Sequence, residues 1–122
     1  MLTNEAKKQI LTSILETIEC ISDKSYQKRV WIEAKGPEVD DFDETCCHFF
    51  DLGECIFDKY EEYNLTEQQQ KILDEFREKF ESFNDGDDRP YLEADFIDTP
   101  EWEGIMKLAK DVLKEFDYKK QL

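Results

Sequence analysis

The stretch DFDETCCHFFDLGECIFDKYEEY, residues 41–63, decides the fold because it places an apolar face and an acidic face on one helix. Its apolar residues recur three and four positions apart, which is the spacing of a buried helix face. They are Phe42, Cys46, Phe49, Phe50, Ile56, Phe57 and Tyr60. Asp41 and Glu44 have the spacing of a capping box at its start. We therefore predict one helix from Asp41 to Tyr63, in which Gly53 either admits a neighbouring helix or marks a break.

The acidic residues of this stretch lie opposite the apolar face and form a stripe. They are Asp40 or Asp41, Glu44, Asp51, Glu54, Asp58 and Glu61. At 1.5 Å per residue, the stripe from Asp41 to Glu61 is expected to be about 30 Å long. Each pair of neighbouring like charges costs roughly 0.2–0.5 kcal/mol, and only Lys59 offsets that cost on this helix. The stripe is therefore either a solvated helix face or a surface kept for a basic partner.

The segments before this stretch are also helical in pattern. Residues 4–21 carry a clear apolar face, and Thr3 or Asn4 can cap the start of that helix. Residues Ser25 to Ala34 contain the large apolar run Val30-Trp31-Ile32, which suits a buried strand or a turn of helix. We favour a helix, because no second strand is available to pair with it.

The segments after residue 63 continue the helical pattern. Thr66 and Gln69 form a second capping box, which opens a helix that runs to Phe83. Residues 84–90 form a loop, and residues 91–98 are irregular or a single turn. Thr99 and Pro100 begin the last helix. The sequence thus predicts an all-α fold, a single-domain bundle over residues 1–122 with four long helices plus a short one.

Composition and charge restrict the class of partner. The chain has 122 residues, enough for one core, and a net charge of −15. Such a charge repels nucleic acid and anionic lipid, so we expect neither as a partner. No run approaches the roughly 18 apolar residues of a membrane span, and the N-terminus lacks the apolar stretch of a signal peptide. We therefore expect a cytoplasmic protein with four reduced cysteines.

The excess negative charge is confined to two segments. Residues 33–63 hold 11 acidic and 2 basic residues, and residues 84–103 hold 8 acidic and 1 basic residue. The remaining 71 residues hold 12 acidic and 13 basic residues. Because the other helices interleave Lys with Glu while these two acidic segments do not, the pattern favours a binding surface for a basic protein.

The residue pattern does not indicate an enzyme. Cys46-Cys47-His48 with Cys55 is the only cluster of metal-type ligands, but adjacent cysteines on a helix point about 100° apart. We expect small buried thiols and a surface imidazole at His48. The loop Asp85-Gly86-Asp87-Asp88 lacks the ligand order of an EF-hand. We therefore predict no catalytic residue, no metal site and no cofactor.

Two stretches resemble a known family. RVWIEAKGPEVDDFDET (residues 29–45) and FIDTPEW (residues 96–102) look like small acidic helical immunity proteins of bacterial contact-dependent growth inhibition and related polymorphic toxin systems. The resemblance implies a cytoplasmic protein that is made beside a toxin and binds that cognate toxin one-to-one. Many such toxins are nucleases, including tRNA-cleaving enzymes, whose clefts are basic because they hold phosphates. Acidic segments would then lie where those phosphates bind.

On this interpretation, the partner-binding residues lie in the two acidic segments and include two aromatic anchors. They are Asp40, Asp41, Asp43, Glu44, Asp51, Glu54, Asp85, Asp87, Asp88, Tyr91, Glu93, Asp95, Asp98 and Trp102. Trp102 fits the core equally well, so Tyr91 is the stronger anchor candidate. Three alternatives stay open: a nucleic-acid-mimic inhibitor or chaperone of a basic host protein, a helical adaptor, and a small metal-dependent enzyme.

Overall fold

A computed structural model describes residues 3–86, 90 and 92–118 of the chain. The elements in chain order are α1 (Asn4–Ser22), α2 (Lys24–Tyr26), the π-helix η1 (Gln27–Ile32), α3 (Phe42–Ile56), the 3-10 helix η2 (Tyr60–Tyr63), α4 (Glu67–Asp85), α5 (Glu93–Phe96) and α6 (Pro100–Glu115). No β-strand occurs in the described residues, so the predicted all-α fold is confirmed. Within those same ranges, none of the helices combines the length and hydropathy that crossing a bilayer requires.

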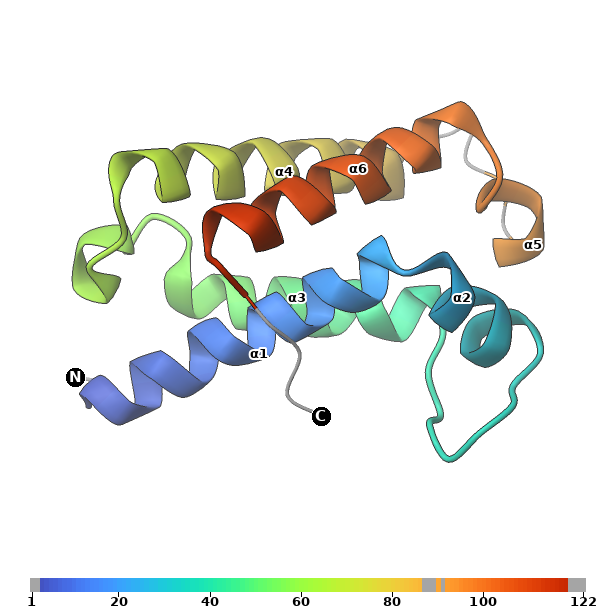
Figure 1. The fold of residues 1–122 in the computed structure, drawn as a ribbon, viewed down its shortest axis with the longest axis horizontal. Helices are drawn as coiled ribbons and strands as arrows, with labels where there is room; N and C mark the ends of the chain where they lie inside the picture. Colours follow the sequence, from blue (N-terminus) through green and yellow to red (C-terminus); the bar gives the residue numbers. More distant parts are fainter. Residues whose placement is uncertain (1–2, 87–89, 91, 119–122) are drawn as a thin grey trace.

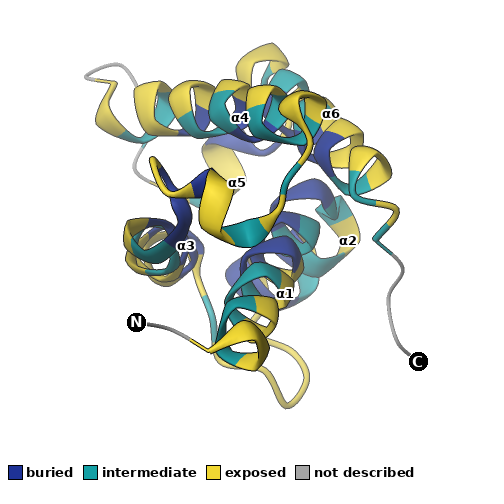
Figure 2. Cartoon of the chain, turned by 90° about the vertical axis from the view of Figure 1, so that its left-hand side faces the viewer, coloured by how far each residue is buried: buried dark blue, intermediate teal, exposed yellow. Residues whose placement is uncertain are grey.

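The four long helices form two layers, with α1 and α3 in one layer and α4 and α6 in the other (Figure 1). Successive long helices run in alternate directions, the up-and-down arrangement of many helical bundles. α1 packs against both α3 and α6, and α6 packs against α4. The buried sides of the helices face the interior between the layers (Figure 2). Each amphipathic stripe therefore meets another one, and one core results.

Aromatic side chains from every layer fill the core. The ring of Phe42, the first residue of α3, lies 4.9 Å from Phe96, 5.7 Å from Trp102 and 5.9 Å from Phe80, measured between ring centroids. Most of these pairs meet edge to face, the arrangement that the ring quadrupole favours. Phe49, about two turns of helix later, makes a second centre against Phe76 and Phe80 of α4. The predicted apolar face of residues 41–57 thus is the face that joins the two layers.

The helix starts agree with the caps predicted from the sequence. Thr3 accepts a hydrogen bond from the amide of Ala6 at 3.0 Å and caps α1. Thr66 and Gln69 form a complete capping box at the start of α4, with bonds of 2.9 and 3.0 Å. Thr99 caps α6, and Pro100 is its first residue. These three caps lie in local sequence, which is why sequence reasoning finds them.

The predicted helix from Asp41 to Tyr63 is wrong at its C-terminal end. α3 ends at Ile56, and Tyr60–Tyr63 form the separate helix η2. Asp58 adopts a left-handed backbone with φ of 66°, which cannot continue a helix. The acidic stripe along α3 is therefore about 22 Å long, from its 15 residues.

Gly53 has a different partner from the one predicted. It lies inside α3, and the ring of Phe57 occupies the space beside it. A Cβ added at Gly53 would lie 2.4 Å from Cε2 of that ring. Gly53 thus makes room for the ring of Phe57, which follows α3, and not for a neighbouring helix.

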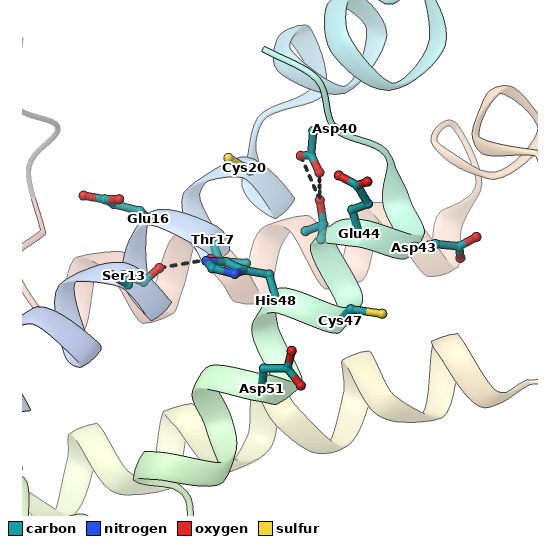
Figure 3. Close-up of a pocket in the computed structure, with 11 residues that line it drawn as sticks. Ser13, Glu16, Thr17, Cys20, Asp40, Asp43, Glu44, Cys47, His48 and Asp51 are labelled. Atoms are coloured by element: carbon teal, nitrogen blue, oxygen red, sulfur yellow. Dashed lines mark hydrogen bonds between the residues drawn. The ribbon is translucent and has the colours of Figure 1, made fainter.

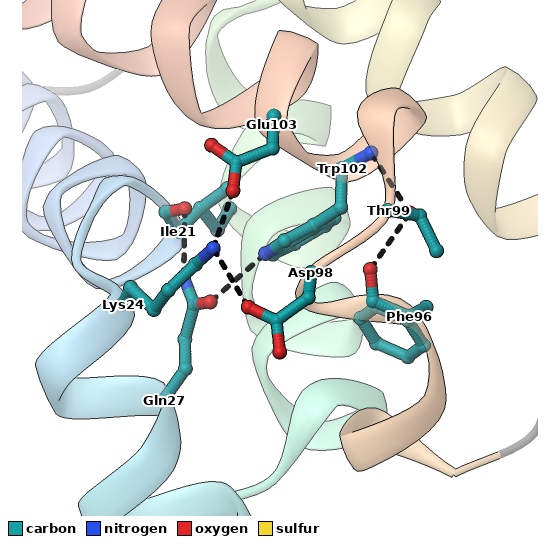
Figure 4. A network of polar contacts seen from close by, with 8 residues as sticks. All are labelled: Ile21, Lys24, Gln27, Phe96, Asp98, Thr99, Trp102 and Glu103. Carbon is teal, nitrogen blue, oxygen red and sulfur yellow. Dashed lines mark hydrogen bonds and ion pairs between the residues drawn. The ribbon is translucent and has the colours of Figure 1, made fainter.

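The predicted helix at residues 25–34 is present but irregular. One turn of α-helix, α2, widens into the π-helix η1, and the buried amide of Gln27 lies at the junction. Gln27 Nε2 donates to the carbonyl oxygens of Cys20 at 3.1 Å and Ile21 at 2.9 Å, which end α1. Gln27 Oε1 accepts from Trp102 Nε1 at 2.9 Å (Figure 4). The buried side-chain amide of Gln27 therefore bonds to two carbonyls at the end of α1 and to the indole N–H of Trp102, and it connects α1 to α6.

Candidate partner-binding site

An open groove runs between α1 and α3, and we name it the acidic groove (Figure 3). Its volume is about 640 Å³. The residues that line it are Ser13, Glu16, Thr17, Cys20, Asp40, Asp43, Glu44, Thr45, Cys47, His48 and Asp51. Five of these residues are acidic, and the described lining of the groove includes no Lys or Arg. The groove therefore concentrates negative charge on one concave surface, where a low-dielectric wall strengthens the field.

Helix geometry explains how α3 supplies most of this charge. Asp43, Cys47 and Asp51 are four residues apart and share one side of α3, while Glu44 precedes His48 by four on the adjacent row. Asp43, Glu44 and Asp51 are all exposed. Asp43 and Glu44 also belong to the first turn of α3, where the helix dipole favours a negative charge. Asp43 and Glu44 therefore stabilise the start of α3, whereas Asp51 lies outside its first turn and does not.

Asp40 was predicted to bind a partner, but its carboxylate is engaged within the fold. Oδ2 of Asp40 accepts from Tyr26 Oη at 2.8 Å and from Trp31 Nε1 at 3.2 Å. The hydroxyl of Thr45 lies 2.9 Å from the same oxygen and 2.9 Å from Asp41 O, so it can donate to either one. Burial, and then the bond to Asp40, raise the pKa of Tyr26. Asp40 thus fastens η1 to the start of α3.

Asp41 has the capping role that the sequence predicts. Its Oδ1 accepts the backbone N–H of Glu44 at 2.7 Å. This bond is one half of a capping box. The other half would be a hydrogen bond from the backbone N–H of Asp41 to the side chain of Glu44, and it does not occur among the hydrogen bonds of the described residues. Asp41 therefore stabilises the start of α3 and contributes charge beside the groove without lining it.

Glu93 shows that the two acidic segments meet in space. Burial raises the pKa of Glu93, and the charges of Asp41 and Asp43 raise it further. A hydrogen bond from the backbone amide of Phe42 lowers this pKa and limits the rise. The carboxylate at the start of α5 thus lies at the start of α3, where three negative charges share the positive end of one helix. The two acidic segments therefore meet at Glu93, a contact that the linear charge pattern alone did not reveal.

The remaining predicted residues of the second segment divide into three groups. Asp85, at the end of α4, and Asp95, in α5, are exposed. Asp98 accepts from Lys24 Nζ at 3.0 Å, and Glu103 binds the same ammonium (Figure 4). The hydrogen bond from Lys24 lowers the pKa of Asp98, so this carboxylate is paired within the chain. The predicted residues Asp87, Asp88 and Tyr91 lie outside the described residues.

Trp102 is not a surface anchor, because its side chain is fully buried at 0 % exposure. Its indole N–H donates to Gln27, and its ring packs against Phe96 at 5.2 Å. The core role that the sequence left open for Trp102 is therefore the correct one. Glu54, by contrast, is exposed on α3 just beyond the residues that line the groove.

The metal-type ligands of the described residues do not gather into one cluster. No group of three or more His, Cys, Asp or Glu side chains within them could hold an ion. Cys46 is buried as predicted, but Cys47 is exposed at the groove. Burial raises the pKa of Cys20 to about 11, so its thiol stays protonated at neutral pH and is a poor nucleophile. The carboxylates of the groove can attract cations and basic side chains.

Sequence reasoning missed three exposed apolar side chains beside the acidic segments. Val39 is 90 % exposed, Leu92 is 58 % exposed and Ile32 is 40 % exposed. Ile32 ends η1 and Leu92 precedes α5, and these two elements contact each other. The available signal was that Val39 and Leu92 fall among acidic and turn-forming residues, outside any helical apolar face. They add apolar area to the acidic end of the bundle.

A second groove, between α4 and α6, provides an internal comparison, and we name it the balanced groove. Its charged lining residues are Glu75, Glu78, Lys79, Lys107 and Asp111. Its volume is about 630 Å³, so it is as large as the acidic groove.

Comparison with protein-family models, with curated proteins and with solved structures found no match to this chain. The geometry and charge of the chain itself are therefore what indicate its function.

Proposed function

We propose that this protein is an immunity protein that binds and neutralises a cognate basic toxin domain, a nuclease, in a one-to-one complex. The acidic groove and the adjoining carboxylates cover the substrate cleft of the toxin. In this proposal the protein acts by binding and catalyses no reaction. The observation that carries the proposal is the lining of the acidic groove, with five carboxylates and neither Lys nor Arg among its described residues.

The physical reason lies in what a nuclease cleft requires. Such a cleft holds phosphates with Lys and Arg side chains, and a row of carboxylates meets those side chains in the same way. Opposite charges also steer the two proteins together and raise the association rate. Asp43, Glu44 and Asp51 are the exposed carboxylates of the groove that α3 presents for this contact. Ile32, Val39 and Leu92 supply apolar contact at the same end of the bundle.

The first test is an affinity pull-down from the native host with this chain as bait, washed at low and then at moderate salt. The proposal expects a basic toxin domain whose nuclease activity is abolished at one equivalent of this protein. Capture of a host DNA-binding protein would instead support the nucleic-acid-mimic alternative. Capture of a neutral protein whose binding does not depend on salt would support the adaptor alternative.

A matched pair of triple variants then tests the groove itself. D43N/E44Q/D51N removes three negative charges from the acidic groove, and E75Q/E78Q/D111N removes three from the balanced groove. We expect the first variant to weaken toxin binding about 100-fold, because each lost contact is worth roughly 1 kcal/mol. The second should change binding less than about threefold. Equal losses for the two variants would show that net charge, not this groove, determines binding.

A further inference from the structure

A third groove lies on the other side of α1, and its walls combine carboxylates with aromatic rings. Glu16 and Cys20 of α1 line both this groove and the acidic groove, so α1 forms the ridge between them. The rings of Tyr26, Phe116 and Tyr118 line it, and its volume is about 770 Å³. We name it the aromatic groove. Its described lining includes five acidic residues and one basic residue, Arg29.

One wall of this groove already holds a guanidinium group. Arg29 makes a two-pronged ion pair with Glu38, with distances of 2.8 Å from Nη1 and 2.7 Å from Nη2. Nη1 also donates to the carbonyl oxygen of Lys35 at 3.1 Å. The Cζ atom of Arg29 lies 5.8 Å from the centroid of the Tyr26 ring, within the range of a cation–π contact. A planar cation is thus bound here by an aromatic face and a fork of carboxylate oxygens.

The opposite wall repeats this combination of ring and negative charge. The chain leaves α6 and crosses toward α1 at residues 116–118 (Figure 1). The backbone amides of Phe116 and Tyr118 bond to the carbonyls of Val112 at 3.1 Å and Leu113 at 2.9 Å, which fixes both residues to the end of α6. Both rings pack partly against the core, so their positions are set before any ligand arrives.

Carboxylates line the groove beside the Tyr118 ring. Burial, and then the charges of Glu19 and Glu16, raise the pKa of the Tyr118 hydroxyl. Asp117 lines the same wall, and the C-terminal end of the α6 dipole adds partial negative charge. A cation placed on this wall would therefore meet an aromatic face and several carboxylates at once.

We propose that the aromatic groove binds an arginine side chain of a partner protein, between Tyr118 and the Glu16 carboxylate of α1. Arginine fits better than lysine, because its planar guanidinium stacks on a ring and bonds a carboxylate through two N–H groups. Taking that arginine as one from the toxin rests on the proposed function above. The guanidinium site itself does not depend on it.

The probe is the blocked amino acid N-acetyl-arginine amide, titrated into the full chain and followed by NMR, with N-acetyl-lysine amide as the comparison. We expect saturable shifts centred on Phe116, Tyr118 and Glu16, and a dissociation constant about fivefold weaker for the lysine derivative. The variant Tyr118→Leu should weaken arginine binding about fivefold, whereas Tyr118→Phe, which keeps the ring, should bind as the wild type does. Thermal melting of each variant checks that the fold is kept.

Three results would overturn this inference. They are equal affinity for the two derivatives, shifts spread evenly over the acidic surface, and unchanged arginine binding in a folded Tyr118→Leu variant. None of them bears on D43N/E44Q/D51N, whose changes lie in the other groove. The two proposals can therefore fail separately.

Discussion

The acidic groove and the balanced groove are alike in size and unlike in charge. They enclose about 640 and 630 Å³, and each lies between two long helices of the same bundle. The balanced groove mixes three acidic with two basic residues, but the acidic groove has five acidic residues and no Lys or Arg in its described lining. A helix–helix groove in this fold is therefore stable with ordinary mixed charge. The acidic lining is not a requirement of the bundle, which is why we assign it to a partner.

The largest effect should come from reversing charge in each groove and measuring toxin affinity. D43K/D51K should weaken binding about 1000-fold, because two attractive contacts become repulsive. E75K/D111K makes the same change of net charge in the balanced groove, and it should weaken binding less than about tenfold. We expect most of the difference in affinity between the two variants to come from the association rate and its salt dependence, which surface plasmon resonance measures. Similar losses in the two variants would break the comparison.

A second effect separates the carboxylates that the fold needs from those it does not. Asp40→Ala removes the acceptor of Tyr26 and Trp31 and should lower the free energy of unfolding by about 2–4 kcal/mol. Asp43→Ala, three residues further along the same groove wall, should change it by less than about 1 kcal/mol. Urea unfolding followed by tryptophan fluorescence measures both values. If Asp40→Ala is as stable as Asp43→Ala, the structural role of Asp40 is wrong.

A third effect has opposite signs in the two grooves. D51N/E54Q relieves repulsion between like charges three residues apart and removes Glu54 from the last turn of α3, where the dipole disfavours it. It should raise the free energy of unfolding by about 0.5–1 kcal/mol at low salt. Glu75→Gln removes a charge that lies four residues from both Lys71 and Lys79 on α4, and it should lower stability by about 0.2–0.5 kcal/mol. Added salt should shrink both changes, and a shared sign would contradict the comparison.

The smallest effect concerns pH. Burial and then Asp41 and Asp43 raise the pKa of Glu93, so the folded state holds this proton more tightly than the unfolded state does. Its stabilisation is fully present below the ordinary pKa of 4.5 and is lost as pH rises through the raised value. Glu93→Gln should therefore be more stable than the wild type at neutral pH, with the difference shrinking in acid. Thermal melting across that pH range measures it.

Asp98 is the matched control for this pH effect, because its pKa shifts the other way. The hydrogen bond from Lys24 lowers the pKa of Asp98 below its ordinary 3.8. Its stabilisation is present above 3.8 and is lost as pH falls through the lowered value. Asp98→Asn should therefore be slightly less stable than the wild type at neutral pH. Parallel pH profiles for the Glu93 and Asp98 variants would contradict both assignments.

Local sequence predicted the parts of the fold that local forces determine. The starts of α1, α4 and α6 follow from Thr3, Thr66 and Thr99, since a cap and an apolar period lie within a few residues of each other. The end of α3 did not follow from the sequence. It depends on Asp58 adopting a positive φ and on the Phe57 ring packing against Gly53, and helical periodicity carries no trace of either event.

The candidate site was predictable in its charge and not in its arrangement. Counting residues located the two acidic segments, but only the tertiary fold brings Glu93 to Asp41 and Asp43. The same limit explains why the internal hydrogen bonds of Asp40 and the burial of Trp102 did not follow from the sequence. Their partners, Tyr26 and Gln27, come from a short irregular helix whose contacts no sequence period describes. A carboxylate that the sequence pattern predicts to be exposed, such as that of Asp40, can thus be hydrogen-bonded within the fold.

The buried amide of Gln27 also has a consequence for the order of folding. Its bond to Trp102 joins residues 75 positions apart, while its bonds to Cys20 and Ile21 span 7 and 6 positions. Contacts of long sequence separation form late, because closing the intervening loop costs conformational entropy. During synthesis from the N-terminus, α1 and η1 can form first but cannot bury this amide until α6 arrives. Helix α6 therefore completes a junction that α1 and η1 prepare, and this part of the fold becomes cooperative only after the chain has been made as far as α6.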